Sequence, residues 1–142
     1  MEDKFNLKRF IDAQSNKHER ALKEIKNGKK QSCWMWYIFP IYHGLGKSST
    51  SVKYAIDSEE EAISYLKHPI LGSRLKAITK EFLSIENKTA YDVLGKPDDW
   101  KIKSSMTLFD IIQSESDLFS SVLEKYFEGN RCSRTIRTLE NK

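Results

Sequence analysis

The chain has 142 residues, of which 31% are charged and 39% hydrophobic, a composition typical of one globular domain (residues 1–142) rather than of a disordered or fibrous protein. No apolar run approaches the roughly 20 residues that span a bilayer, and the acidic N-terminus lacks the apolar core of a secretion signal, so we expect a cytoplasmic protein with no membrane contact. The net charge of +4 is concentrated in residues 1–56, which carry 11 Lys or Arg against 5 Asp or Glu, a smaller excess than nucleic-acid binders usually show.

The first predicted elements are two helices followed by an irregular segment. Apolar residues at helical spacing predict a helix over residues 5–14, and Ala21, Leu22 and Ile25 predict a second helix that ends at Gly28. Residues 29–57 show no sustained period. Within them, 34–39 could form either a short buried helix or a strand, which Pro40 ends.

From Ser58 to Phe127 the signals for helices are clearer. Ser58 and Glu61 have the spacing of a capping box, and the apolar stripe that follows is interrupted at His68, which is expected to act as a capping or turn residue before Pro69. Further helices are predicted over 71–87, 89–95, 97–112 and 119–127. The sequence therefore predicts an all-α, compact single-domain bundle of six to seven helices with one long irregular loop rich in aromatic residues and glycine.

The aromatic part of that loop is the first candidate for function. Trp34, Trp36, Tyr37 and Phe39 lie within six positions and lead into the turn-prone segment 43–49. Such a cluster is typical either of a tightly packed core corner or of the wall of a ligand pocket, and the sequence leaves both interpretations open.

The glycine-rich part, residues 44–48, ends in the Gly-Lys-Ser of a phosphate-binding P-loop. The P-loop motif requires another Gly five positions before Gly46, where this chain has Ile41, and it requires an α/β context, so a nucleoside triphosphatase is rejected. A simpler anion site remains open, in which the backbone at Gly44 and Gly46 acts with Lys47 and Ser48 to bind a phosphate or carboxylate. The alternative is an ordinary surface loop.

Little in the sequence supports a metal site or a reactive cysteine. The three histidines have no partner at metal-ligand spacing, so neither a metal site nor a cofactor is predicted. His43 is the best candidate for proton transfer because it lies inside the aromatic-to-glycine loop. Cys33 and Cys132 are 99 positions apart and are expected to be two reduced thiols.

The segment 98–109 is the second candidate for function. It places Lys103, Ser104, Ser105 and Thr107 close together, and three hydroxyl residues in four positions are poor choices for helix propensity alone. These hydroxyls either cap a helix or offer hydrogen bonds to a ligand.

Two hypotheses follow for function. In the first, a pocket binds a phosphorylated or nucleotide-like small anion, and residues 34–48 meet residues 101–109 around a cavity. Its walls would be Trp34, Trp36 and Phe39, its anion-binding groups Gly44, Gly46, Lys47, Ser48 and Lys103, its orienting groups Ser104 and Thr107, and its catalytic candidates His43 and Ser105. In the second, the protein is a non-enzymatic interaction domain whose aromatic residues fill the core and whose basic face binds an acidic protein or nucleic acid.

Several short strings in order along the chain resemble one known family, across roughly residues 5 to 139. They are Arg9-Phe10 with Ala13-Gln14, Ala21-Leu22 with Glu24-Ile25 and Gly28, Ser32 to Pro40, Gly44-Leu45-Gly46 with Ser48, Tyr54-Ala55-Ile56, Glu61-Ala62, Tyr65-Leu66, His68-Pro69 with Leu71, Arg74-Leu75, and Lys103 to Phe109. The chain resembles the bacterial and fungal proteins known as domain of unknown function 1810, which share a mycobacterial hypothetical-protein-like helical fold.

The resemblance implies a compact, mainly helical single domain and no established reaction, substrate or cofactor. One position departs from the family pattern, which commonly has histidine where this chain has Cys33. This departure indicates that the position is not strictly catalytic. The layout around Trp100, Met106 and 125–127 is also similar to helical glycosidases of ADP-ribose-type and riboflavin-pathway N-glycosides, which implies related chemistry by analogy of fold alone.

Overall fold

The structure is a computed structural model that describes residues 3–141, so the first two residues of the acidic N-terminal segment considered above lie outside it. The described part contains ten helices and, apart from an isolated parallel bridge between Tyr42 and Ile56, no β-structure. The helices are α1 (Lys8–Gln14), α2 (His18–Lys26), α3 (Met35–Ile38), α4 (Ser49–Lys53), α5 (Glu59–Lys67), α6 (Leu71–Ser84), α7 (Ala90–Leu94), α8 (Asp98–Ile111), α9 (Leu118–Phe127) and α10 (Ser133–Glu140). The all-α class is confirmed.

The number of helices differs from the predicted six to seven, mainly in the irregular segment. Residues 29–57 contain two short helices, α3 and α4, joined by the loop that carries the glycines. Helices of four and five residues span little more than one turn, so they leave no periodic pattern in the sequence.

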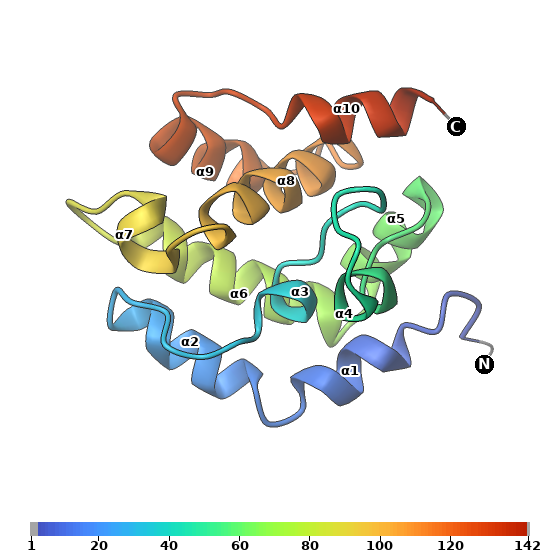
Figure 1. The fold of residues 1–142 in the computed structure, drawn as a ribbon, viewed down its shortest axis with the longest axis horizontal. Helices are drawn as coiled ribbons and strands as arrows, with labels where there is room; N and C mark the ends of the chain where they lie inside the picture. The colour runs from blue at the N-terminus through green and yellow to red at the C-terminus, as the bar shows by residue number, and fades with distance from the viewer. Residues whose placement is uncertain (1–2, 142) are drawn as a thin grey trace.

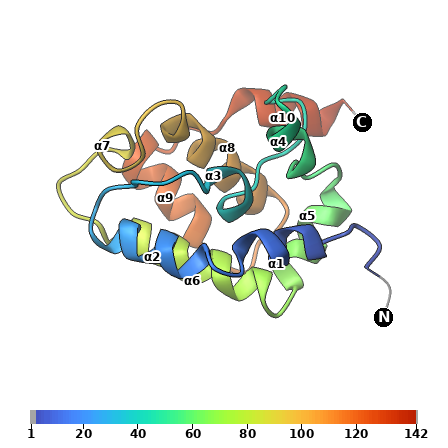
Figure 2. The same ribbon diagram turned by 60° about the horizontal axis from the view of Figure 1, so that its bottom comes forward.

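The helices are arranged around α6, α8 and α9 (Figure 1). α1 and α2 lie along one edge of the molecule and α10 along the opposite edge, while α3 and α4 lie on the face nearest the viewer. α2 packs against α6, α6 against α9 and α9 against α8, and Figure 2 shows α2 and α6 side by side. No helix within residues 3–141 is long and apolar enough to cross a bilayer.

One cluster of buried hydrophobic side chains fills the space between the helices. Its centre includes Tyr65, whose ring lies 5.0 Å from that of Phe10 and 5.6 Å from that of Phe109. In the described residues, every helix except α4 contributes a buried apolar side chain to the cluster. Burial of these side chains supplies most of the favourable free energy of folding.

Helix ends are fixed partly as the sequence predicts. Ser58 Oγ accepts a hydrogen bond from the backbone N–H of Glu61 (3.0 Å), but the Glu61 carboxylate completes no capping box with Ser58. Instead it accepts from the N–H of Asp57 (3.1 Å) and forms a buried ion pair with Arg9 (2.7 Å), which joins α5 to α1. The complete capping box lies at the start of α7, between Thr89 and Asp92.

Candidate functional site

The segment before α3 is held in place by one carboxylate on α2. Glu24 accepts hydrogen bonds from the backbone N–H of Gln31 (2.7 Å) and of Ser32 (3.1 Å), from the Ser32 hydroxyl, and from Trp34 Nε1 (2.9 Å). Burial alone would raise the pKa of Glu24, but the hydrogen bonds from Ser32, Gln31 and Trp34 outweigh it and lower the pKa from 4.5 to about 2. Glu24 therefore fixes the direction in which Trp34 and α3 leave the loop.

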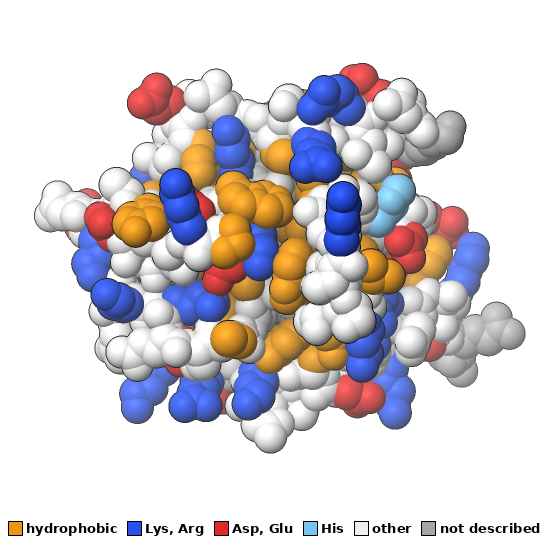
Figure 3. All heavy atoms as spheres, viewed as in Figure 1, with side chains coloured by type: hydrophobic (Ala, Val, Ile, Leu, Met, Phe, Trp, Pro, Cys, Tyr) orange, Lys and Arg blue, Asp and Glu red, His pale blue; other side chains and the backbone are white. Residues whose placement is uncertain are grey.

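A recess of about 170 Å³ opens beside α3. It lies where the loop before α3 meets α4 and the first turn of α8. Figure 3 shows hydrophobic side chains gathered over α3 and the beginning of α8, with Lys or Arg side chains among them. The recess is lined by Lys30, Cys33, Trp34, Met35, Trp36, Tyr37, Thr50, Asp98 and Lys101.

Three charged side chains converge in this recess. Asp98 pairs with Lys30 through one carboxylate oxygen (2.9 Å) and with Lys101 through the other (3.1 Å). All three side chains are between 9% and 13% exposed, so the cluster is largely shielded from water. Two ammonium groups and one carboxylate leave a net positive charge in a mostly apolar setting, where electrostatic attraction is stronger than at an open surface.

The two tryptophans form the aromatic wall of the recess. Lys101 Nζ lies 3.9 Å from the centroid of the half-buried Trp36 ring, and Lys30 Nζ lies 5.2 Å from the ring of Trp34. Both distances are within the range of cation–π attraction, which orients the ammonium groups as well as stabilising them.

The glycine loop approaches Trp36 closely. A Cβ atom added at Gly46 would lie 2.6 Å from Ser51 Oγ and 3.0 Å from Trp36 Cη2, so only glycine allows this approach. A small cavity of about 60 Å³ lies here, lined by Trp36, His43, Gly44 and Gly46 among others. His43 is exposed, and its ring is tilted against that of Tyr42 at a centroid distance of 4.6 Å; it also lines a wider, open cavity of about 890 Å³, together with Asp57.

The remaining residues predicted from the aromatic and glycine segment lie away from the recess. Phe39 is fully buried in the core, with its ring 6.3 Å from that of Trp34. Ser48 is the N-cap of α4, where its hydroxyl accepts from the N–H of Ser51 (3.1 Å), and Lys47 is exposed. Cys33, which lines the recess, and Cys132 are free thiols.

The hydroxyls predicted on α8 turn toward the core and α10 instead of toward Trp36. Ser104, Ser105 and Thr107 have no exposed surface. Ser104 donates to Cys132 Sγ (3.1 Å), and Thr107 Oγ1 accepts from the Cys132 N–H (3.0 Å) while donating to the Lys103 carbonyl (2.7 Å). These contacts attach the start of α10 to α8.

Two further predicted positions on α8, Ser105 and Lys103, are not among the residues that line the recess. Ser105 Oγ is buried without a hydrogen-bond partner in the described residues. Lys103 lies with its Nζ 5.7 Å from the Phe127 ring on α9. The residue of α8 that meets the tryptophans is Lys101, because two positions along a helix turn the side chain by about 200°.

Of residues 101–109, Lys101 is the one that lines the recess beside residues 34–37. The sequence interpretation missed Lys30, Asp98 and Lys101 as a set. A usable signal was the spacing of Asp98 and Lys101, three positions apart on a predicted helix, which places opposite charges on one face. Within residues 3–141, no group of His, Cys, Asp or Glu is arranged to hold a metal ion.

Comparison with known proteins places the chain in a family. A search of curated proteins gives no match. Among solved structures, the crystal structure of the conserved hypothetical protein Rv1873 from Mycobacterium tuberculosis is similar, with a TM-score of 0.96 and 38% sequence identity over 99% of this chain and 100% of that chain. Residues 4–139 match the family described as Protein of unknown function (DUF1810). The chain thus belongs to the DUF1810 family.

Proposed function

We propose that the recess beside Trp36 binds a small phosphorylated molecule whose anionic group lies against Lys30 and Lys101. The observation that carries this proposal is the convergence of both lysines on Asp98 beside the Trp36 ring. Asp98 holds the two ammonium groups in place before a ligand arrives, which reduces the entropy lost on binding. The volume of about 170 Å³ is below that of sites that enclose whole drug-sized ligands, so the recess takes the anionic end while the rest of the ligand extends outward.

The alternative, an interaction domain with a basic face, predicts tryptophans that are buried with no cleft beside them. Trp34 fits the first part of that description, at 1% exposed, although it lines the recess. Trp36 does not, because it is half-buried and lines two cavities. The ligand-binding interpretation accounts for Trp36 and for the buried lysine pair together, so we favour it.

A second part of the proposal is that the protein catalyses a reaction on the ligand bound in this recess. His43 is the residue we assign to proton transfer, because it lines the small cavity on the Gly46 side of Trp36. Related N-glycoside or ADP-ribose chemistry would require the glycosidic bond to lie on that side of the ring. The backbone at Gly44 and Gly46 lines the same cavity and would contact that part of the ligand.

The first test is a thermal-shift screen of the purified protein against inorganic phosphate, sugar phosphates, nucleotides and ADP-ribose. A ligand present at 100 times its dissociation constant stabilises the folded state by about 2.7 kcal/mol, which raises the unfolding midpoint measurably. Intrinsic fluorescence provides a second readout, because Trp36 lies in the recess.

Two matched variants on α8 locate the binding site. Lys101→Gln removes a cation of the recess, and Lys103→Gln removes a cation two residues further along, outside it. We expect Lys101→Gln to abolish the ligand-induced shift and Lys103→Gln to preserve it. The proposal fails if no anion in the panel raises the midpoint, or if the shift survives in Lys101→Gln.

A further inference from the structure

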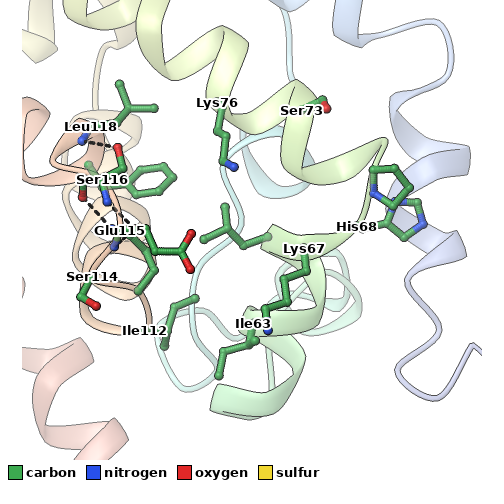
Figure 4. A pocket seen from close by; sticks show the side chains of 14 residues that line it. Ile63, Lys67, His68, Ser73, Lys76, Ile112, Ser114, Glu115, Ser116 and Leu118 are labelled. Carbon is green, nitrogen blue, oxygen red and sulfur yellow. Dashed lines mark hydrogen bonds between the residues drawn. The ribbon is translucent and has the colours of Figure 1, made fainter.

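A separate cavity of about 490 Å³ lies on another part of the molecule. It is formed where the corner between α5 and α6 faces the loop between α8 and α9, residues 112–117 (Figure 4). None of its lining residues is shared with the recess beside Trp36. Its volume falls within the range of small-molecule sites.

The inner wall of this cavity is apolar. Leu118 and Phe119 at the start of α9 are buried, and Leu66 and Ile112 are half-buried beside them. Ile63 on α5 extends the apolar surface outward and is 36% exposed. An apolar ligand group placed against this wall would release the water that now covers it, which is favourable in proportion to the area buried.

The rim carries charged groups that form no ion pair within residues 3–141. Lys67 from α5 and Lys76 from α6 line the cavity, and Figure 4 shows the Glu115 carboxylate pointing into it from the loop opposite. Two ammonium groups and one carboxylate leave an excess of positive charge at the mouth.

The two sides of the mouth have defined shapes because side chains brace the backbone there. Gln113 Oε1 accepts from the N–H groups of Glu115 (3.1 Å) and Ser116 (3.0 Å), and Gln113 Nε2 donates to the Ser116 carbonyl (2.9 Å). On the opposite side, His68 Nδ1 accepts from the N–H groups of Ile70 (3.1 Å) and Leu71 (3.3 Å). His68 thus acts as the predicted turn residue, and the cavity is largely pre-formed.

We infer that this cavity binds a small amphipathic anion, with an apolar body against the inner wall and a single carboxylate near Lys67 and Lys76. A cation is disfavoured by the two ammonium groups, and an uncharged apolar molecule leaves them without a partner. The Glu115 carboxylate repels the ligand's carboxylate and therefore weakens binding. Removal of the Glu115 charge should strengthen the binding of an anion, which tests the charge of the ligand.

The test measures decanoate binding by isothermal titration calorimetry on the full chain. An exposed ion pair stabilises by up to about 1 kcal/mol, so Lys67→Gln and Lys76→Gln should each raise the dissociation constant by up to about fivefold. Glu115→Gln should lower it by a similar factor. Lys80→Gln, on an exposed part of α6 outside the cavity, is the matched control and should leave it unchanged.

Further measurements separate this site from the recess and from nonspecific adsorption. Lys101→Gln should leave decanoate binding intact, and decanol, which lacks the charge, should bind equally to the wild type and to the Lys67→Gln/Lys76→Gln double variant. The side chains of Lys67, Lys76 and Glu115 are exposed, so their substitution should leave the thermal midpoint unchanged. The inference is overturned if decanoate does not bind, if the double variant binds it as tightly as the wild type, or if Glu115→Gln weakens binding.

Discussion

Glu24 lies on α2 between the exposed Lys23 and Lys26, yet only 9% of its own side chain is exposed. The sequence pattern of this stretch predicts a charged, solvent-exposed helix face. It gives no reason to expect that Glu24 is more buried than Glu19. The difference arises from the loop that follows, which folds back and brings the backbone of Gln31 and Ser32 and the ring nitrogen of Trp34 to the carboxylate. Such a contact depends on tertiary structure, so local pattern could not predict it.

The Glu24 hydrogen bonds make stability depend on pH in the acid range. Because folding lowers the pKa of Glu24 from 4.5 to about 2, its contribution is fully present above pH 4.5 and is lost as the pH falls toward 2. The shift corresponds to about 3 kcal/mol of unfolding free energy. We expect Glu24→Gln to be destabilised near neutral pH by an amount of that order, and to lose much less further stability than the wild type between pH 4.5 and pH 2.

Urea unfolding at several pH values, followed by circular dichroism, measures this dependence. Glu19→Gln is the control, because Glu19 is an exposed residue in the first turn of the same helix. Parallel stability-against-pH curves for the wild type and Glu24→Gln would show that the hydrogen bonds to Glu24 do not stabilise the loop.

The α8 lysines show how far residue-scale prediction extends. The sequence hypothesis assigned Lys103 to ligand binding, whereas the α8 lysine that lies beside Trp36 in the structure is Lys101. α8 is buried on most of its surface, including its serines and threonine, so it lacks the polar face by which an exposed side of a helix is normally recognised. Without that face, the sequence could not show which lysine of α8 lies on the side that faces the tryptophans.

At the scale of elements, the accuracy of the predicted helices depended on their length. α5, α6 and α9 carry apolar stripes of several turns, and all three were predicted close to their observed bounds. α3 and α4 are too short for a stripe, and α4 has no buried apolar side chain to mark it. The candidate recess is built from these short elements, the loop before α3 and the start of α8, which is why its members could not be grouped from sequence.

The corner between α5 and α6 provides an element-scale prediction. A Cβ atom at Gly72 would lie 2.0 Å from the carbonyl oxygen of Leu66, a backbone atom that cannot rotate away. Gly72→Ala should therefore separate the end of α5 from the start of α6 and destabilise the protein by about 3 kcal/mol or more. Chemical denaturation measures the loss.

Ser73→Ala, at the next position along α6, is the control for that substitution. Ser73 is exposed, so its replacement should change the unfolding free energy by less than about 0.5 kcal/mol. If Gly72→Ala were as mild as Ser73→Ala, the close approach of the two helices would not be a tight constraint on the corner.

At the scale of the whole molecule, the core does not divide into parts. The central cluster joins Phe10 of α1, Tyr65 of α5, Phe109 of α8 and Leu139 of α10, so helices from both ends of the chain contribute to one set of buried side chains. The cluster also connects the recess to the core, because Trp34 belongs to the cluster and lines the recess. Loss of packing in one region should therefore be felt in all the others.

We accordingly propose that the chain is a single cooperative domain that unfolds in one transition. Thermal or urea unfolding should give the same midpoint by far-ultraviolet circular dichroism, which follows all helices, and by tryptophan fluorescence, which follows the region of Trp34, Trp36 and Trp100. Leu139→Ala on α10 tests the longest connection: it removes a side chain only 6% exposed and should lower both midpoints together, with a loss of about 2 to 5 kcal/mol. A fluorescence midpoint that stayed fixed while the helical signal shifted would mean that α10 folds apart from the rest of the molecule.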